Sequence, residues 1–246
     1  EARPGVTADA AALCLKSGNA ALLRGGKEAI RTNTAIAAVL ARSLKASGLP
    51  PAAVGFVSDP DRAAVKRLLT LDCLIDLVIP RGGPELTVMV RRESMIPVLS
   101  HDKGLCHTYV DQAADLEMAL AVCFNAKAER PGVCNAMETL LVHQDVADRF
   151  LPKMAARYAE AGVELRGCPK TRKIIPEAKR AVQADWDTEY LGLVLSVKVV
   201  QSLNEAVEHI AKHGSGLAEA IITKSKPAAD LFLSQVDARA VYDNAS

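Results

Sequence analysis

Several features that would assign this chain to a particular class of protein are missing from its sequence. Lys and Arg total 30 against 29 Asp and Glu, so the formal net charge of +1 gives no reason to expect nucleic acid or an anionic membrane as a partner. No apolar run reaches the roughly 18–20 residues that span a bilayer, and there is no signal-peptide pattern. We therefore predict a soluble, cytoplasmic protein.

Metal-site and disulfide patterns are missing too. The six cysteines follow no C-x-x-C spacing, and most of them lie in apolar segments. Reduced thiols in a cytosolic protein fit this pattern better than a disulfide framework or a zinc site, so we expect no metal.

The usual nucleotide-binding fingerprints are also absent. The sequence contains no G-x-G-x-x-G. Gly26-Lys27 is not part of a P-loop, because Ala21 stands where the motif needs Gly and Glu28 stands where Ser or Thr should hold magnesium. A dinucleotide or nucleoside triphosphate would have to be bound through other residues.

What the sequence does contain is an alternation of short apolar runs with amphipathic helix patterns. Such alternation predicts an α/β fold, with a parallel sheet covered by helices on both faces. We expect a boundary near residue 111, and a surface loop with little periodicity at 167–190. Strand-like runs lie at 20–23, 53–57, 75–79, 96–99, 106–110, 139–142, 163–166, 193–200, 220–223 and 239–242.

Two glycine turns that carry cations follow predicted strands. Arg24-Gly25-Gly26-Lys27-Glu28 opens a helix, and Pro80-Arg81-Gly82-Gly83 follows the run at 75–79. Free backbone N–H groups at a helix start favour an anion, and ligands of open α/β sheets bind at the carboxyl edge of the strands. On these residues alone, a helix-start turn with solvated cations explains the first turn equally well.

Cys134 is the candidate nucleophile. It follows a Pro131-Gly132 break, between a helix pattern at about 113–128 and the short apolar run at 139–142. A cysteine at such a turn can be held rigidly and still be reached by a substrate, and a nearby helix start or cation would favour its thiolate. The alternative is that Cys134 is a small apolar filler, which is the commoner role of a lone cysteine.

Several short motifs are spread over essentially the whole chain. They are Glu1-Ala2-Arg3-Pro4, Lys16-Ser17-Gly18-Asn19-Ala20, Leu23-Arg24-Gly25-Gly26-Lys27-Glu28, Ile79-Pro80-Arg81-Gly82-Gly83, Asn125-Ala126-Lys127, Arg130-Pro131, Cys134-Asn135, Val241-Tyr242 and Asn244-Ala245-Ser246. Together and in register, these motifs resemble those of the gamma-glutamyl phosphate reductases, which belong to the aldehyde dehydrogenase superfamily. The resemblance implies an aldehyde-dehydrogenase-like α/β fold, with a Rossmann-like NADP-binding domain at 1–110, incomplete at its N-terminus, and an α/β catalytic domain at 111–246.

The resemblance also implies an activity, the NADPH-dependent reduction of L-glutamate 5-phosphate to L-glutamate 5-semialdehyde and phosphate in proline biosynthesis. Cys134 would form a thioester, and its backbone N–H would be the first donor to the developing oxyanion. Two other hypotheses about the function remain open: the chain is the reductase part of a bifunctional pyrroline-5-carboxylate synthase, or it is a catalytically silent aldehyde-dehydrogenase-like binding protein.

Individual residue roles are carried over from the same resemblance. The resemblance implies that NADPH is bound by Arg24, Lys27, Arg81, Gly82, Gly83 and Glu189, and that the substrate is bound by Arg3 and Asn135. The alternative for Glu189 is that it is a solvated carboxylate in a loop.

The segment 98–104 has no Glu where hydrolytic aldehyde dehydrogenases carry their general base, which fits a reductase that needs no activated water. His101 and Asp102 in that segment could transfer protons, and we expect His107 in the following strand to be a packed core residue.

The resemblance bears on the extent and assembly of the protein as well. The chain opens at Glu1 without Met, and the family extends beyond both ends of the matched segment, so we interpret the chain as an interior piece of a longer polypeptide. A homo-oligomer is implied, and an association with glutamate 5-kinase is left open.

Overall fold

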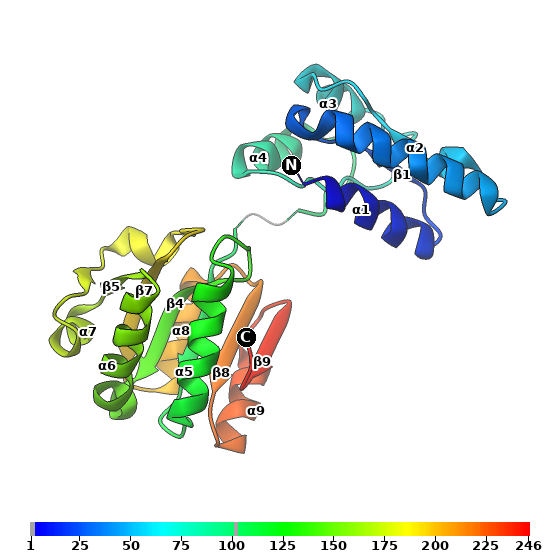
Figure 1. The fold of residues 1–246 in the computed structure, drawn as a ribbon. Coiled ribbons are helices and arrows are strands. Elements are labelled where there is room, and N and C mark those ends of the chain that lie inside the picture. The colour runs from blue at the N-terminus through cyan, green and yellow to red at the C-terminus, as the bar shows by residue number, and fades with distance from the viewer. Residues whose placement is uncertain (1–2, 101–102) are drawn as a thin grey trace. The chain divides into compact units, whose positions relative to one another are not determined.

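The computed structural model describes residues 3–100 and 103–246, with only the backbone of Pro84. The chain divides into two compact units, Glu1–Asp102 and Lys103–Ser246, which are described separately (Figure 1). In the described residues, no helix is both long and apolar enough to cross a bilayer.

The first unit packs helices around a small parallel sheet. In its described residues 3–100 this sheet has two strands, β1 (Ala21–Leu23) and β2 (Val54–Phe56). α1 ends at Lys16 and is followed by Gly18 at a φ of +80°, which glycine adopts without strain. The helices are α1 (Pro4–Lys16), α2 (Ile30–Ala46), α3 (Arg62–Leu68) and α4 (Pro84–Glu93), with 3₁₀ turns η1 (Lys27–Ala29) and η2 (Pro51–Ala53).

Two strands predicted for this unit are wrong. The apolar runs 75–79 and 96–99 contribute only an isolated parallel bridge between Val78 and Val98. Three of their large side chains are about half exposed, at 49% for Leu77, 55% for Ile79 and 54% for Leu99. The continuous apolar pattern predicted strands covered on both faces, and neither run has that cover here.

The second unit is a sheet between two helical layers. In the described residues 103–246 its seven strands are all parallel to their neighbours, in the order β6-β5-β7-β4-β3-β8-β9. The strands are β3 (Cys106–Val110), β4 (Met137–His143), β5 (Glu164–Gly167), β6 (Lys179–Arg180), β7 (Val194–Val200), β8 (Ala218–Ile222) and β9 (Ala240–Asp243).

Helices cover both faces of this sheet, as the alternating pattern predicts (Figure 1). Leu140 and Val142 of β4 pack in a cluster with residues of α5 and α6, and Leu141 between them packs with residues of α8 and α9. The helices are α5 (Leu116–Phe124), α6 (Gln144–Glu160), α7 (Pro169–Ile174), α8 (Leu203–His213) and α9 (Lys226–Gln235), with a π-helix η3 (Asn125–Glu129) and a 3₁₀ turn η4 (Gln183–Asp187).

Two expectations about segment limits differ from the structure. The expected boundary near residue 111 lies after β3, whereas the observed division precedes β3, which pairs with β4 and β8 inside the second sheet. The expected loop at 167–190 contains α7, β6 and η4. These elements are too short to show a period in a sequence rich in Lys and Pro.

Candidate active site

Cys134 lies in an exposed turn immediately before β4. Backbone hydrogen bonds close this turn, since the N–H of Val133 donates to Arg130 O at 3.3 Å and the N–H of Ala136 donates to Val133 O at 3.1 Å. Asn135 beside it is also exposed. The turn therefore presents the thiol to solvent at the amino-terminal end of a buried central strand.

Gly104 packs directly against the backbone of Cys134. A Cβ placed on Gly104 would lie 1.7 Å from the carbonyl oxygen of Cys134 and 2.9 Å from its Cα, so only glycine fits here. The same oxygen is 3.6 Å from Sγ of Cys106 in β3. Burial raises the pKa of the Cys106 thiol to about 12, so Cys106 stays protonated at neutral pH while it supports the turn.

Gly104 also links Cys134 to Glu189. Its backbone N–H donates to Oε1 of Glu189 at 2.9 Å. Glu189 is half-buried in the segment between η4 and β7. The structure thus brings the predicted Cys134-Asn135 turn close to the predicted Glu189, which lies more than fifty positions further along the sequence.

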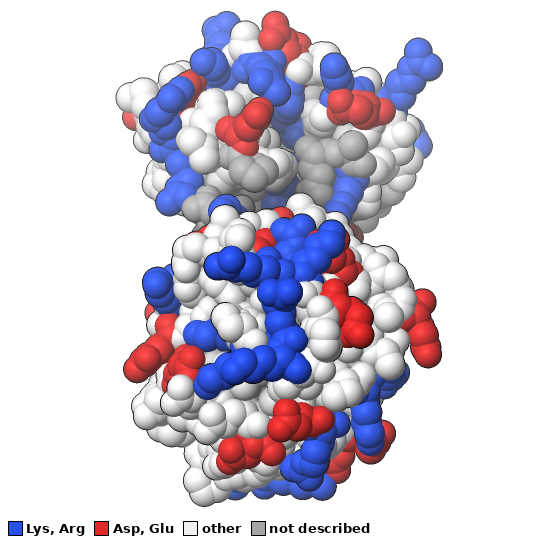
Figure 2. All heavy atoms as spheres, turned by 90° about the vertical axis from the view of Figure 1, so that its left-hand side faces the viewer, with Lys and Arg blue, Asp and Glu red and all other residues white. Residues whose placement is uncertain are grey.

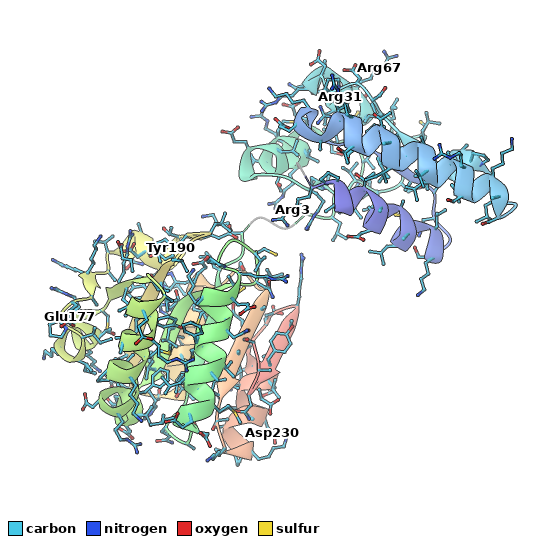
Figure 3. All side chains as sticks on the ribbon, viewed as in Figure 1. Arg3, Arg31, Arg67, Glu177, Tyr190 and Asp230 are labelled. Carbon is cyan, nitrogen blue, oxygen red and sulfur yellow. The ribbon has the colours of Figure 1, made fainter. Side chains whose placement is uncertain are left out.

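The segment that carries Glu189 is held by its neighbour Tyr190, which is labelled in Figure 3. The Tyr190 hydroxyl lies 3.0 Å from Oδ1 of Asp185 and 2.8 Å from Oγ of Ser196. Burial alone would raise the pKa of Asp185, but the N–H of Val182 and the Arg166 guanidinium, 2.6 Å away, hold it below its usual range. Glu189 therefore lies on a fixed segment.

The predicted cofactor cations of the first unit lie near the carboxyl end of β1. Arg24 follows β1, and its Nη2 donates to the carbonyl oxygens of Pro60 and Asp61. Lys27 is the first residue of η1, and α2 begins directly after η1. Gly25 is pressed against Asn33, whose Nδ2 would be 2.0 Å from a Cβ at this position. This turn thus has the strand, glycine, cation and helix order that the sequence predicts.

Four other predicted residues lie at the starts of two helices in the same unit. Gly83 is the N-cap of α4, and Arg81 and Gly82 precede it. Arg3, labelled in Figure 3, is the N-cap of α1. The candidate site residues thus divide between the units, with Arg3, Arg24, Lys27 and 81–83 in the first and Cys134, Asn135 and Glu189 in the second. His101 and Asp102 lie outside the described residues.

Sequence reasoning missed a buried ion pair beside the nucleophile turn. Lys127 in η3 and Glu138 in β4 are 2.7 Å apart and at most 1% exposed. The helical spacing gave a signal, because Leu120, Cys123 and Lys127 follow one another at intervals of three and four residues and so share the buried face.

The prediction that His107 is a packed core residue is confirmed. It is 2% exposed, and its Nδ1 lies 3.0 Å from Oε2 of Glu219. The His209 ring packs edge-on against the His107 ring, with 5.5 Å between the two ring centroids. Burial, with the nearby His107 and Lys198 adding to the effect, lowers the pKa of His209 to about 2.

The buried His209 predicts a dependence of stability on pH. Because an unfolded histidine titrates near 6.5, the unfolded chain takes up a proton below that pH while folded His209 does not, so stability falls as pH drops. The slope from this group approaches about 1.4 kcal/mol per pH unit between roughly pH 6 and 5. We expect His209→Leu to reduce the loss of unfolding free energy over this range in denaturant titrations. Equal losses would mean that His209 titrates alike in both states.

A basic surface lies elsewhere on the second unit, on the face shown in Figure 2. It includes a pocket of about 410 Å³ lined by Pro169, Arg172, Lys173 and Arg180, from α7 and the edge strand β6. β5 and β7 separate this edge of the sheet from β4. The basic surface is therefore distinct from the Cys134 turn.

The chain is similar in sequence and in fold to known proteins. The gamma-glutamyl phosphate reductases of Caldanaerobacter subterraneus subsp. tengcongensis and Desulfatibacillum aliphaticivorans are 51% and 54% identical to the chain over all 246 residues. The crystal structure of gamma-glutamyl phosphate reductase from Thermotoga maritima matches 99% of the chain with a TM-score of 0.94 and 46% identity. The chain spans 59% of the length of each of these proteins.

The family pattern itself covers most of the chain. The pattern of the aldehyde dehydrogenase family matches residues 5–172, a range that includes both glycine turns, the Cys134 turn and the first three strands of the second sheet. The family resemblance predicted from the sequence is confirmed by this match and by the relatives above. With its parallel sheets, its exposed cysteine turn and this match, the chain belongs to the aldehyde dehydrogenase family.

Proposed function

We propose that the complete protein reduces L-glutamate 5-phosphate to L-glutamate 5-semialdehyde and phosphate, with NADPH as the reductant. The observation that carries the proposal is the exposed Cys134, held in a closed turn and linked through Gly104 to the carboxylate of Glu189. The relatives named gamma-glutamyl phosphate reductase, about half identical over the whole chain, supply the substrate class.

Cys134 performs the covalent step of the proposed reaction. Its thiolate attacks the acyl phosphate carbon, the bond to the phosphate oxygen breaks, and a thioester forms on Sγ. The backbone N–H of Cys134 donates to the oxyanion that develops in this step. After reduction, the thiohemiacetal on Cys134 collapses to the aldehyde and frees the thiolate.

The residues present fit a nicotinamide cofactor, which supplies the hydride when it is bound. Gly104 N–H occupies one oxygen of the Glu189 carboxylate, and a carboxylate has capacity for further donors such as ribose hydroxyls. Arg24 and Lys27 supply positive charge at the carboxyl end of β1, and this favours an anionic phosphate. The backbone of 81–83, at the start of α4, suits a pyrophosphate.

The reverse reaction gives the sharpest test of this function. The complete protein would be supplied with glutamate 5-semialdehyde, phosphate and NADP⁺, and NADPH formation followed by absorbance. The proposal requires that NADPH formation depends on phosphate. Formation that ignores phosphate would instead indicate a hydrolytic aldehyde dehydrogenase, and no formation at all would favour a catalytically silent member of the family.

Arg24 gives a second test, of cofactor choice. Because a charge-assisted hydrogen bond to a phosphate contributes about 1.5–3 kcal/mol, we expect Arg24→Ala to weaken NADPH binding by about 10- to 100-fold and NADH binding much less. Dissociation constants from fluorescence titration of both cofactors would measure the difference.

Arg42→Ala is the matched control, since this exposed arginine lies in the last turns of α2, far along the helix from the Arg24 turn. It should leave both constants unchanged. Equal losses of NADPH and NADH binding in Arg24→Ala would show that Arg24 does not bind the 2′-phosphate, the group by which NADPH differs from NADH.

A further inference from the structure

The Lys127–Glu138 pair is expensive to bury, and nothing in the covalent step uses it. Burial lowers the pKa of Lys127 and raises that of Glu138, and the opposite charge 2.7 Å away acts against both shifts. A pair of apolar side chains would fill the same volume at little cost in stability. The position of the pair suggests what it does instead.

Lys127 lies in a local irregularity of the helix. α5 ends at Phe124, and the following five residues, Asn125–Glu129, form a π-helix with Lys127 at its centre. π-helical turns are rare and are frequent at functional sites. The Cys134 turn begins directly after the π-helix, and the end of the lysine side chain reaches Glu138 at the start of β4.

The second carboxylate oxygen of Glu138 holds the segment that carries Glu189. Oε1 of Glu138 accepts the backbone N–H of Leu191 at 3.2 Å, two residues beyond Glu189. Leu191 has a φ of +53°, in the left-handed region that costs a leucine about 1–2 kcal/mol. Such a conformation persists only where the surroundings impose it, and the hydrogen bond to the buried carboxylate is one such restraint.

We propose that Lys127 and Glu138 are positioning residues, which fix the segment Glu189-Tyr190-Leu191 against the Cys134 turn. Glu138 is four residues after Cys134 in a rigid strand, so its bond to Leu191 N–H sets the Glu189 carboxylate at a constant place relative to the nucleophile. Lys127 orients Glu138, because its Nζ donates to the other carboxylate oxygen, Oε2, at 2.7 Å. The effect on cofactor binding rests on the proposed function above, in which the Glu189 carboxylate accepts hydrogen bonds from ribose hydroxyls of the cofactor.

Two double variants of the complete protein separate this role from mere stabilisation. Lys127→Met with Glu138→Gln removes both charges but keeps an amide oxygen that can accept the Leu191 N–H. Lys127→Met with Glu138→Leu removes the charges and the acceptor together. Hydrogen exchange of a peptide covering 186–192 reports the anchor, and KM for NADPH against kcat reports its effect on the reaction.

We expect exchange of the Leu191 amide to be at least tenfold faster in the leucine variant than in the glutamine variant, and KM for NADPH to be about tenfold higher at a similar unfolding temperature. Asp111→Asn is the matched control. Asp111 has a buried carboxylate that accepts three hydrogen bonds. It follows the carboxyl end of β3, whereas Gly104 precedes the amino end, so Asp111→Asn should leave the exchange of the Leu191 amide unchanged.

Equal Leu191 exchange in the two double variants would overturn the proposal. If the leucine variant does not fold, Glu138→Asp gives the same comparison, because it keeps the charge but withdraws the carboxylate by one methylene, and unchanged exchange there would overturn the proposal too. Hydrogen exchange needs no substrate. Faster exchange therefore supports the anchor even where the complete protein fails to reduce L-glutamate 5-phosphate, in which case only the proposed function fails.

Discussion

Replacing Cys134 by serine is expected to lower turnover in the phosphate-dependent assay by at least about a thousandfold, which corresponds to roughly 4 kcal/mol of transition-state stabilisation. A serine hydroxyl has a far higher pKa than a thiol and is a poor nucleophile without an adjacent base. Cofactor binding should stay within a few-fold, because the Gly104 contact with Glu189 does not involve the thiol. Initial rates and a cofactor titration on the complete protein would measure both.

Cys73→Ser provides the matched control for Cys134→Ser. Cys73 is also an exposed free cysteine, but it lies in the first unit and is not one of the candidate site residues. It should keep full activity. Substantial residual turnover in Cys134→Ser would remove Cys134 from the role of nucleophile, whatever the result for Cys73.

Gly104→Ala should have the second largest effect. The added methyl would lie 1.7 Å from the carbonyl oxygen and 2.6 Å from the carbonyl carbon of Cys134, and both are backbone atoms that no rotamer change can move away. The turn would have to shift as a whole, at a cost above about 3 kcal/mol. We expect a large fall in the unfolding temperature and loss of activity in the fraction that folds.

A second glycine of the same region serves as the comparison for Gly104→Ala. A Cβ on Gly132 would meet only the carbonyl oxygen of Leu191, at an ordinary 3.7 Å, so Gly132→Ala should leave the unfolding temperature nearly unchanged. Differential scanning calorimetry of both variants would measure the contrast. A Gly104→Ala protein as stable as the Gly132→Ala protein would contradict the packing of Gly104 against Cys134.

The second unit could be predicted closely from the sequence, because its strands are buried on both faces. The predicted strands at 106–110 and 139–142 are confirmed as β3 and β4, and the exposed turn of Cys134 lies where the Pro131-Gly132 break predicts it. A continuous apolar run bounded by turn residues is a strong signal for a central parallel strand. The order of the strands could not be predicted, because it depends on pairings between distant segments.

Local patterns failed where cover or contact comes from far along the chain. The apolar run 75–79 has the composition of a strand, but in the described residues it forms a single bridge. Gly104 contacts Cys134 from thirty positions away, and Leu191 donates to Glu138 from fifty-three positions away. No local spacing in the sequence predicts either contact. Family resemblance supplied the candidate role of Glu189, which composition and periodicity could not.

The parallel pairing of β3 also has a consequence for how the chain folds. β3 lies between β4 and β8, and the register pairs His107 with Glu219, so the middle of the sheet joins segments 112 residues apart. A loop of this length must be closed before the pairing contributes any stability, and contacts of high sequence separation form slowly. During synthesis, the edge of β3 that pairs with β8 stays unpaired until β8 has left the ribosome. The unfinished chain is then most exposed to aggregation along this edge.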